Sequence, residues 1–376
     1  MSDANAPGER SRTDHADRAG ERGGRSPDEL FAALDLGTNN CRLLIAAPTR
    51  DGFRVVEAFS RIVRLGEGLS QTGRLQEPAM ERAMVALRIC AERLRRRGGP
   101  RLRAIATQAC RSADNGLEFL RRVTLETGLE LQVITPHEEA RLSVAGCLNL
   151  LDRQTDAALV LDVGGGSTEL SWVDLSDPAA RARAGRPGLG AMPPIRAWLS
   201  IPVGVVTLAE RFPEQRPGER AWFRAMVDSV KAPIAAFEPA EAMREVFDSG
   251  RAHLIGTSGA ITSLAGLHLN LARYERARVD GLWMSQADCV AAADRLLGLT
   301  PQARGAQPCI GPDRADLVLA GAAILQAVQE LWPCERVRVA DRGLREGVLL
   351  SLMAENAPKS RNRRRRRRGP RIVAAA

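Results

Sequence analysis

Residues 159–170 read LVLDVGGGSTEL, and this segment carries most of the information about how the chain folds. The apolar run that ends at Asp162 predicts a buried β-strand, the three glycines predict a tight turn, and a second strand is expected after it. Glycines let backbone N–H groups approach a ligand closely, and several inward-pointing N–H groups form a site for anions. The turn nevertheless lies between two carboxylates, Asp162 and Glu169, and contains no lysine. The segment therefore predicts a phosphate site that also requires a cation.

A second segment, LDLGTNNCRLLI (residues 34–45), repeats this pattern. In both segments an Asp ends an apolar strand, a glycine lies two residues further on, small polar residues turn the chain, and an apolar strand returns. One such hairpin arises easily by chance, but two at corresponding places do not. The repeat therefore predicts two similar domains that face each other.

The rest of the chain has the apolar periodicity of an α/β protein. Strands are expected at residues 30–36, 41–47, 53–59, 102–107, 131–135, 158–163, 168–173, 195–204, 253–257 and 336–340. Helices are expected at residues 78–97, 117–126, 138–151, 260–267, 285–297 and 314–331, and in a last segment at 341–354.

A chain of 376 residues exceeds a comfortable single core, so two domains are the natural expectation. The predicted organisation is a disordered polar arm, a first domain, a second domain whose last helix packs back on the first, and a disordered Arg-rich tail. These four parts are assigned to residues 1–28, 29–155, 156–356 and 357–376.

The net charge of +9 comes from the tail and not from the predicted domains. The tail contains no acid and nine positive charges: Lys359, Arg361, the six arginines at 363–368, and Arg371. Residues 1–356 are therefore close to neutral, which argues against a basic nucleic-acid-binding body. The tail is interpreted as a disordered appendage, and weak contact with RNA or polyphosphate is the alternative.

Composition also excludes several other classes of protein. No apolar run is long enough to span a bilayer, and the N-terminus lacks the apolar core of a signal peptide, so a cytoplasmic protein without membrane contact is expected. The seven cysteines include no CxxC and are expected to be reduced thiols. Four histidines without an HExxH make a histidine-built zinc site improbable.

Three glycine turns are candidate phosphate sites, because each one exposes backbone N–H groups at the end of a strand. The third precedes a helix whose N-terminus could assist. The candidate phosphate-binding residues of the three turns are Gly37, Thr38 and Asn39 with the nearby Arg42; Gly164, Gly165, Gly166, Ser167 and Thr168; and Gly256, Ser258 and Gly259.

The carboxylates beside the turns are candidate ligands for Mg²⁺ or Mn²⁺. Mg²⁺ prefers oxygen ligands and is usually held by one or two carboxylates together with phosphate and water. Asp162 and Glu169 flank the second turn, and Asp35 occupies the corresponding place before the first. The alternative for Glu169 is an ordinary turn cap or surface ion pair.

Two further segments contain polar residues with both ordinary and functional interpretations. TPHEEARLS places Glu138 and Glu139 at the start of a helix, where acidic residues are common because the helix dipole favours them. TQACRSADN places Arg111 just after a strand, where the side chain could bind phosphate or be solvated.

Taken together, these segments resemble the exopolyphosphatase and guanosine-pentaphosphate phosphatase family, within the superfamily of actin, sugar kinases and heat-shock chaperone ATPases. DLGTNNCRLL is similar to the family's first phosphate motif, D-x-G-S-N-S, and LDVGGGSTEL to its second. ATQACRSADN resembles the segment that carries a substrate-binding arginine, here Arg111. PHEEARL resembles N-E-E-A-R-L, whose second glutamate is the family's proposed catalytic base, here Glu139. IGTSGAITSLA and LREGVL resemble later signatures.

The resemblance covers residues 31–350 and implies a fold and an activity. The implied fold is two facing actin-like (ribonuclease H-like) domains, each a mixed sheet flanked by helices, with a cleft between them. The implied activity is hydrolysis of the terminal phosphoanhydride of polyphosphate or guanosine pentaphosphate, with a water activated by Glu139 and charge offset by Mg²⁺. Family members are often dimers, so a homodimer is one implied state.

The chain also departs from the family pattern. Longer members carry a further helical, HD-like domain where this chain has its short tail, which implies weaker processive degradation of long polyphosphate. Near the end the family often has D-G-A-L-R-E-G, whereas this chain has Arg342 and Gly343 after Asp341. An ATPase or kinase of the same fold and a non-catalytic polyanion- or RNA-associated protein remain as alternatives, because fold alone does not determine function.

Overall fold

Two hairpins of the same design lie at the centre of the computed structural model. The first joins β1 (Phe31–Leu36) to β2 (Asn40–Thr49), and the second joins β6 (Ala157–Val163) to β7 (Thr168–Asp174). Each pair of strands is antiparallel. The same hydrogen bond closes both turns: Gly37 N donates to Asn40 O and Gly164 N donates to Ser167 O, each at 2.9 Å. The repeat predicted from the sequence is therefore present in the backbone.

The structure describes most of the chain, in the ranges 29–49, 52–183, 193–237, 241 and 243–356. The predicted arm at residues 1–28 and the predicted Arg-rich tail at 357–376 lie outside these ranges. The described residues belong to one compact unit. The division into two domains between residues 155 and 156 therefore stays a prediction.

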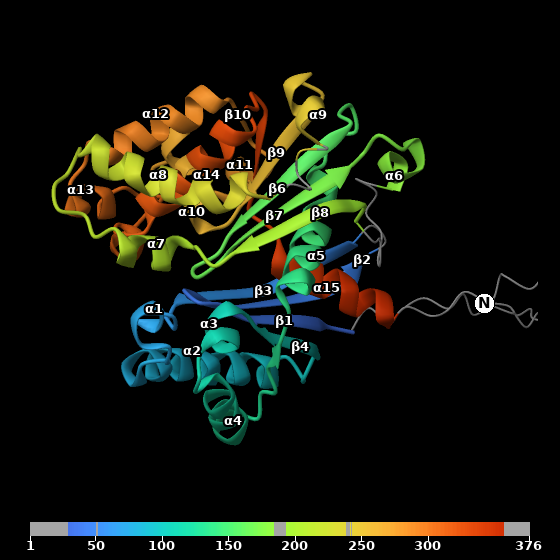
Figure 1. Ribbon diagram of the computed structural model, residues 1–376. Helices are drawn as coiled ribbons and strands as arrows, with labels where there is room; N and C mark the ends of the chain where they lie inside the picture. The colour runs from blue at the N-terminus through green and yellow to red at the C-terminus, as the bar shows by residue number, and fades with distance from the viewer. Residues whose placement is uncertain (1–28, 50–51, 184–192, 238–240, 242, 357–376) are drawn as a thin grey trace, which may run out of the picture. The chain divides into compact units, whose positions relative to one another are not determined.

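Each hairpin continues into a mixed sheet, and the two sheets have corresponding strand orders (Figure 1). The five-stranded first sheet has the order β3-β2-β1-β4-β5, and the six-stranded second sheet has the order β8-β7-β6-β9-β11-β10. In both, the first strand of the hairpin is parallel to its other neighbour, β4 or β9. The remaining strands are β3 (Gly52–Ile62), β4 (Arg101–Ala106), β5 (Gln132–Val133), β8 (Ile195–Ile201), β9 (Ala252–Thr257), β10 (Trp283–Met284) and β11 (Val337–Ala340).

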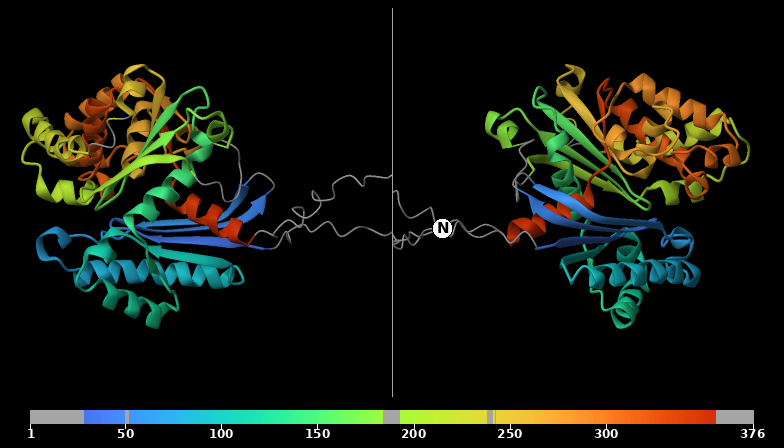
Figure 2. Two further views of the ribbon diagram at one scale, coloured as in Figure 1. Left: turned by 45° about the vertical axis from the view of Figure 1, so that its right-hand side comes forward. Right: turned by 180° about the vertical axis from the view of Figure 1, so that it is seen from behind.

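Helices cover the faces of both sheets, as Figures 1 and 2 show. Those in the first half of the chain are α1 (Leu69–Thr72), α2 (Glu77–Arg96), α3 (Gln108–Ser112), α4 (Gly116–Thr127), α5 (Pro136–Cys147) and the 3₁₀ turn η1 (Leu148–Leu150). Those in the second half are α6 (Pro178–Arg183), α7 (Val205–Arg211), α8 (Arg220–Ala235), α9 (Arg244–Asp248), α10 (Gly259–His268), α11 (Arg276–Val279), α12 (Gln286–Leu297), α13 (Pro301–Gly305), the 3₁₀ turn η3 (Pro312–Arg314), α14 (Val318–Leu331) and α15 (Leu344–Glu355).

Strand β1 is buried on both faces, which explains why its sequence is apolar without alternation. On one face Leu34 and Leu36 pack with α2, α3 and α4, and on the other Phe31 and Ala33 pack with α5 and α15. Strand β6 is arranged in the same way, with α8, α10, α12 and α14 on one face and α5 on the other. Helix α5 therefore contacts both sheets.

The last helix, α15, returns to the first sheet and packs along α5. This packing is close because glycines lie at the crossing: a Cβ on Gly347 would be 1.9 Å from Leu142 O, and one on Gly146 would be 1.9 Å from Gly343 O. Val348, Leu349 and Met353 of α15 complete the core on that face of the sheet. The packing anchors the N-terminus of α15, and with it the segment 341–346, between the two sheets.

The predicted fold class is confirmed, since two mixed sheets flanked by helices form the structure. Most predicted elements are present within a few residues of their expected bounds. The predicted helix at residues 314–331 begins later, at Val318, because residues 312–314 form a 3₁₀ turn. The predicted helix at 138–151 ends at Cys147 and continues as a 3₁₀ turn. Helices α7 and α8 are not among the predicted elements.

No helix among the described residues is sufficiently long and apolar to cross a membrane. All seven cysteines are buried and unpaired, as expected for reduced thiols. Cys41 Sγ and Cys90 Sγ lie 4.0 Å apart.

Candidate functional site

A cavity of about 550 Å³ lies between the two sheets and is lined by all three glycine turns. The first two turns touch across it: a Cβ on Gly165 would lie 2.9 Å from Asn39 N and 3.0 Å from Thr38 Cβ. No side chain fits at this contact, which accounts for glycine there. The contact brings the backbone of both turns to one wall, so both turns could contribute to holding the same phosphate chain.

The third turn contributes a strained residue to the same cavity. Ser258 has a φ of 118°, which non-glycine residues rarely adopt, and its buried hydroxyl oxygen has no hydrogen-bond partner. The neighbouring Gly259 begins α10, whose N-terminus faces the cavity wall. An outlier of this kind at a cavity, together with an unsatisfied hydroxyl, is typical of a ligand site.

The buried carboxylates of Asp35, Glu139 and Glu169 line the cavity, and so does the half-buried carboxylate of Asp162. Burial raises the pKa of Asp35 to about 6. Burial, and then the charge of Asp162, raises the pKa of Glu169 to about 7. Burial also raises the pKa of Asp162, although a 2.5 Å hydrogen bond from Ser143 Oγ opposes the shift. Such a cluster of perturbed acids in one cavity is characteristic of a functional site.

Glu139 occupies its position because of the local start of α5. Thr135 Oγ1 caps the helix by accepting from Glu138 N at 3.2 Å, and Pro136 is compatible with the first turn. This start places Glu139 in the first turn with only 7% of its surface exposed. Burial, followed by the charge of Glu169, raises the pKa of Glu139 well above its ordinary value.

Arg111 lies directly against Glu139. Its Nη1 donates to Glu139 Oε2 at 3.2 Å and to Ile134 O at 2.7 Å. The charge of Arg111 lowers the pKa of Glu139, and therefore opposes the effects of burial and of the neighbouring acids. Glu139 can thus act as a base, and Arg111 is the adjacent group that adjusts its proton affinity.

Arginines that line the cavity bring positive charge to it. Arg42 of β2 and Arg345 of α15 both line the cavity, and both lower the pKa of Asp35 by their charge. Arg314 lies over the third turn, with its Cζ 3.7 Å from the place that a Cβ on Gly259 would take. These three guanidinium groups could offset several charges of a phosphate chain.

Oxygen atoms without partners suit a hard cation at the same site. Asp35 Oδ1, Asn39 Oδ1 and Asn40 Oδ1 are buried, line the cavity and accept no hydrogen bond. Among the described residues, no three His, Cys, Asp or Glu side chains form a group that could hold a metal ion by themselves. The donor set fits Mg²⁺, which uses one or two carboxylates and completes its shell with phosphate and water oxygens.

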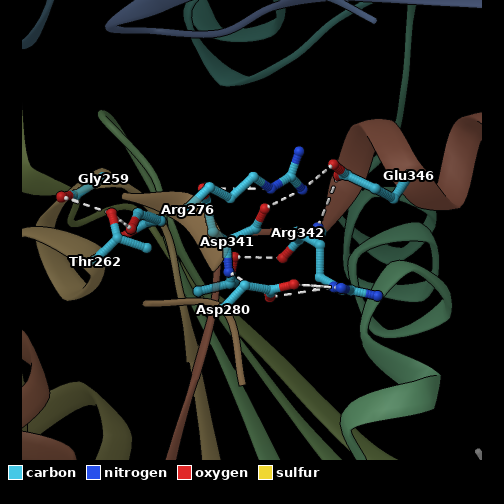
Figure 3. Close-up of polar contacts among 10 residues, drawn as sticks. Gly259, Thr262, Arg276, Asp280, Asp341, Arg342 and Glu346 are labelled. Carbon is cyan, nitrogen blue, oxygen red and sulfur yellow. Dashed lines mark hydrogen bonds and ion pairs between the residues drawn. The ribbon is translucent and has the colours of Figure 1, made fainter. Parts of the chain in front are cut away.

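An ion-pair network fixes the segment that carries Arg345 (Figure 3). Glu346 accepts from Gly343 N at 3.0 Å and from Arg276 Nη2 at 3.1 Å. Arg342, where the family often has a glycine, is held by Asp280, whose Oδ2 lies 3.0 Å from Arg342 Nε. The departure from the family pattern at this position therefore adds a structural ion pair at the cavity wall.

Three predicted site residues do not line the cavity. Thr168 is fully buried and its hydroxyl donates to Val203 O at 2.6 Å, so it holds a neighbouring loop. Gly256 lies inside β9, where a Cβ would be 2.9 Å from Ile261 Cγ2. Glycine is therefore needed there for packing against Ile261. Arg111 contacts Glu139 but does not line the cavity. The structure brings the other fourteen together at the wall: Asp35, Gly37, Thr38, Asn39, Arg42, Glu139, Asp162, Gly164, Gly165, Gly166, Ser167, Glu169, Ser258 and Gly259.

Sequence reasoning missed several residues of the wall. Arg345 lies in LREGVL, a segment that resembled a family signature without being assigned a role. Tyr274, Arg314 and Asp341 also line the cavity, from segments between the recognised motifs. No local pattern distinguishes Arg314 from the many other arginines of this chain, so only the fold reveals its position.

We expect Glu169→Gln to raise the thermal stability of the protein at pH 8 without divalent cations. The folded-state pKa of Glu169 is raised from 4.5 to about 7. The folded protein therefore has the full stability that a neutral Glu169 allows below pH 4.5, and it loses that stability as the pH rises through 7, because the buried carboxylate then ionises. At pH 8 its buried charge costs on the order of 3 kcal/mol, which the neutral amide avoids. Calorimetry should show a gain in Tm of several degrees at pH 8 and a much smaller one at pH 5.

Glu92→Gln is the matched control for this substitution, because the Glu92 side chain is 59% exposed on α2. It should leave Tm unchanged at both pH values. An equal gain for Glu169→Gln at pH 5 and pH 8 would contradict the assignment of the effect to a buried charge.

Comparison with known proteins agrees with this geometry. The chain matches the model of the Ppx/GppA phosphatase family over residues 44–356. It is 30% identical over 337 residues to exopolyphosphatase 2 of Mycobacterium tuberculosis, a match that covers 85% of this chain and 98% of that protein.

Solved structures are similar over the same extent. The Ppx/GppA family member of Aquifex aeolicus is 27% identical with a TM-score of 0.67, covering 88% of this chain and 99% of that one. An exopolyphosphatase from Cytophaga hutchinsonii has a TM-score of 0.73 at 23% identity, covering 88% and 99%, and shows the shared fold. The two phosphate turns, the buried acids and these matches lead to one conclusion: the chain belongs to the Ppx/GppA phosphatase family.

Proposed function

We propose that this phosphatase hydrolyses the terminal phosphoanhydride of inorganic polyphosphate, of guanosine pentaphosphate (giving guanosine tetraphosphate), or of both. The observation that carries the proposal is the position of Glu139. Its buried carboxylate, with a raised pKa, faces a cavity that two glycine turns also line. A base beside a phosphate cradle is the arrangement that hydrolysis by water requires.

In the proposed reaction, Glu139 accepts a proton from a water as the water oxygen bonds to the terminal phosphorus. The bond between that phosphorus and the bridging oxygen breaks, and the shortened chain leaves with the bridging oxygen. The two phosphate turns hold the chain by backbone N–H groups other than those of Gly37 and Gly164, which close the turns. Arg42, Arg314 and Arg345 offset its negative charge.

The carboxylates of the site also provide for a divalent cation. Asp35, Asp162 and Glu169 are the candidates from which one or two carboxylates would hold Mg²⁺ or Mn²⁺ together with substrate oxygens. The cation would supply charge stabilisation on the phosphate oxygens. It would also offset the burial of these acids, which raises their pKa values.

The proposal is tested by measuring phosphate release from four substrates side by side: short polyphosphate, long polyphosphate, guanosine pentaphosphate and ATP. Each is assayed with Mg²⁺, with Mn²⁺, and with excess chelator. Cation-dependent release from polyphosphate or guanosine pentaphosphate, at a kcat/KM at least tenfold above that for ATP, is the expected result. Preferential release from ATP would instead favour an ATPase, and the absence of release from all four would refute the proposal.

A further inference from the structure

The segment of residues 63–70, which we call the brace segment, lies directly behind the first phosphate turn. Val63 N and Arg64 N both donate to Asn39 O, at 2.8 and 3.1 Å, and Gly66 N donates to Thr38 O at 2.9 Å. The contact is tight, because a Cβ on Gly66 would lie 2.3 Å from Thr38 Cγ2. These bonds fix the carbonyl groups of Thr38 and Asn39, and thereby the direction of the peptide units that face the cavity.

The brace segment is also bound to the second half of the chain at two places. Glu210 of α7 accepts from Gly68 N at 2.9 Å and from Ser70 Oγ at 2.8 Å. Arg64 forms a two-pronged ion pair with Asp316, with both N···O distances at 2.8 Å, and also donates to Asp313 O at 3.1 Å. Arg64 makes these contacts from a left-handed backbone conformation with a φ of 47°.

Helix α7 continues this path to the second phosphate turn. At its start, Val205 N donates to Gly164 O at 2.9 Å and Val206 N donates to Gly165 O at 2.8 Å. Near its other end it presents Glu210 to the brace segment (Figure 1 shows α7 facing α1, where Ser70 lies). One seven-residue helix therefore connects the carbonyl groups of the second turn to the segment that holds the first.

We propose that Glu210 and Arg64 are positioning residues that set the spacing of the two phosphate turns across the cavity. The inference rests on the proposed function, because the spacing matters for in-line attack on a phosphate held by both turns. Neither residue lines the cavity, so neither is a catalytic residue. A displacement of about 1 Å in such a site lowers turnover strongly, so loss of the brace should reduce kcat more than it raises KM.

The contacts are suited to a positioning role rather than to global stability. The side chains of Arg64 and Asp316 are 31% and 51% exposed, and exposed ion pairs contribute little to folding. Variants of these residues should therefore fold. Arg224, whose partners Asp228 and Glu330 both lie in the second half of the chain, is the matched control, because it forms a comparable exposed ion-pair cluster away from the turns.

The test compares Glu210→Ala, Glu210→Gln and the control Arg224→Ala by hydrogen exchange and by kinetics on short polyphosphate. Glu210→Ala should speed exchange of amides in peptides covering residues 37–41 and 63–70, and lower kcat about tenfold or more. Glu210→Gln keeps an acceptor oxygen and should recover most of the kcat. Arg224→Ala should change neither quantity.

A charge swap tests the second contact. Arg64→Asp places two acids together and should lower kcat. The double variant Arg64→Asp with Asp316→Arg restores an ion pair of opposite orientation and should restore kcat in part. Asp is suitable at position 64 because it tolerates the positive φ there. Unchanged exchange in Glu210→Ala would overturn the proposal, as would faster exchange with an unchanged kcat. If the wild-type protein releases no phosphate, the proposed function fails, and hydrogen exchange alone then decides whether the brace holds the first turn.

Discussion

Glu139→Gln is expected to lower kcat for phosphate release by about 10³-fold, while substrate binding changes little. Glutamine has nearly the same shape as glutamate but cannot accept a proton from water at neutral pH. The replacement should keep the packing, because glutamine is nearly isosteric with glutamate, and burial favours a neutral side chain at position 139. Stopped assays of phosphate release give kcat, and calorimetric titration of the variant with short polyphosphate gives affinity.

Glu138→Gln is the natural control, because Glu138 is the preceding residue in the same helical turn and pairs with Arg103 instead of lining the cavity. It should retain most of the activity. A Glu139→Gln variant with near-wild-type kcat would show that Glu139 is not the base. A variant that no longer binds substrate would show instead that Glu139 is needed to organise the site.

The acidic limb of the pH–rate profile provides an independent check. The base must be deprotonated to act, so kcat/KM should rise with pH through a pKa above the ordinary value of glutamate. The charge of Arg111 lowers the pKa of Glu139, and Arg111→Met should therefore move this limb to higher pH. A limb that stays in place would mean that another group controls it.

The repeat of the hairpins was predictable because it rests on local rules. A strand that ends in Asp, followed by a glycine turn and a returning strand, specifies both the antiparallel pairing and the side of the sheet on which the turn lies. In the structure, corresponding hydrogen bonds close the two turns, from Gly37 N to Asn40 O and from Gly164 N to Ser167 O. The position and the closure of the two turns could therefore be predicted from the sequence, whereas their role in binding phosphate stays a prediction.

The identity of the neighbours of each turn could not be predicted in this way. Glu139 and Glu169 are thirty residues apart in the chain, and only the packing of α5 against both sheets brings their charges close enough to raise one pKa through the other. Thr168 shows the opposite case: its motif suggested a phosphate donor, but the hydroxyl is used by Val203 O. Motifs identify which residues are near the site, whereas side-chain direction depends on tertiary contacts.

The contact between the two turns gives the second large effect. Gly165→Ala is expected to lower kcat/KM by about 10²-fold, because its Cβ would lie 2.9 Å from Asn39 N and 3.0 Å from Thr38 Cβ. These are main-chain and branched side-chain atoms that cannot rotate away, so the turns must separate. Gly165 does not have a positive φ, so alanine is compatible with its backbone conformation and the effect is steric alone.

Gly298→Ala is the matched control, since its Cβ would lie 3.7 Å from the nearest atom, Asp294 O, at an ordinary contact distance and remote from the cavity. It should leave kcat/KM unchanged. Steady-state kinetics on short polyphosphate, with Tm measured for each variant, separates the local effect from unfolding: Gly165→Ala should lose activity at a Tm within a few degrees of the wild type. Full activity in Gly165→Ala would mean that the turns act independently, and phosphate would then be held by one turn and not by the pair.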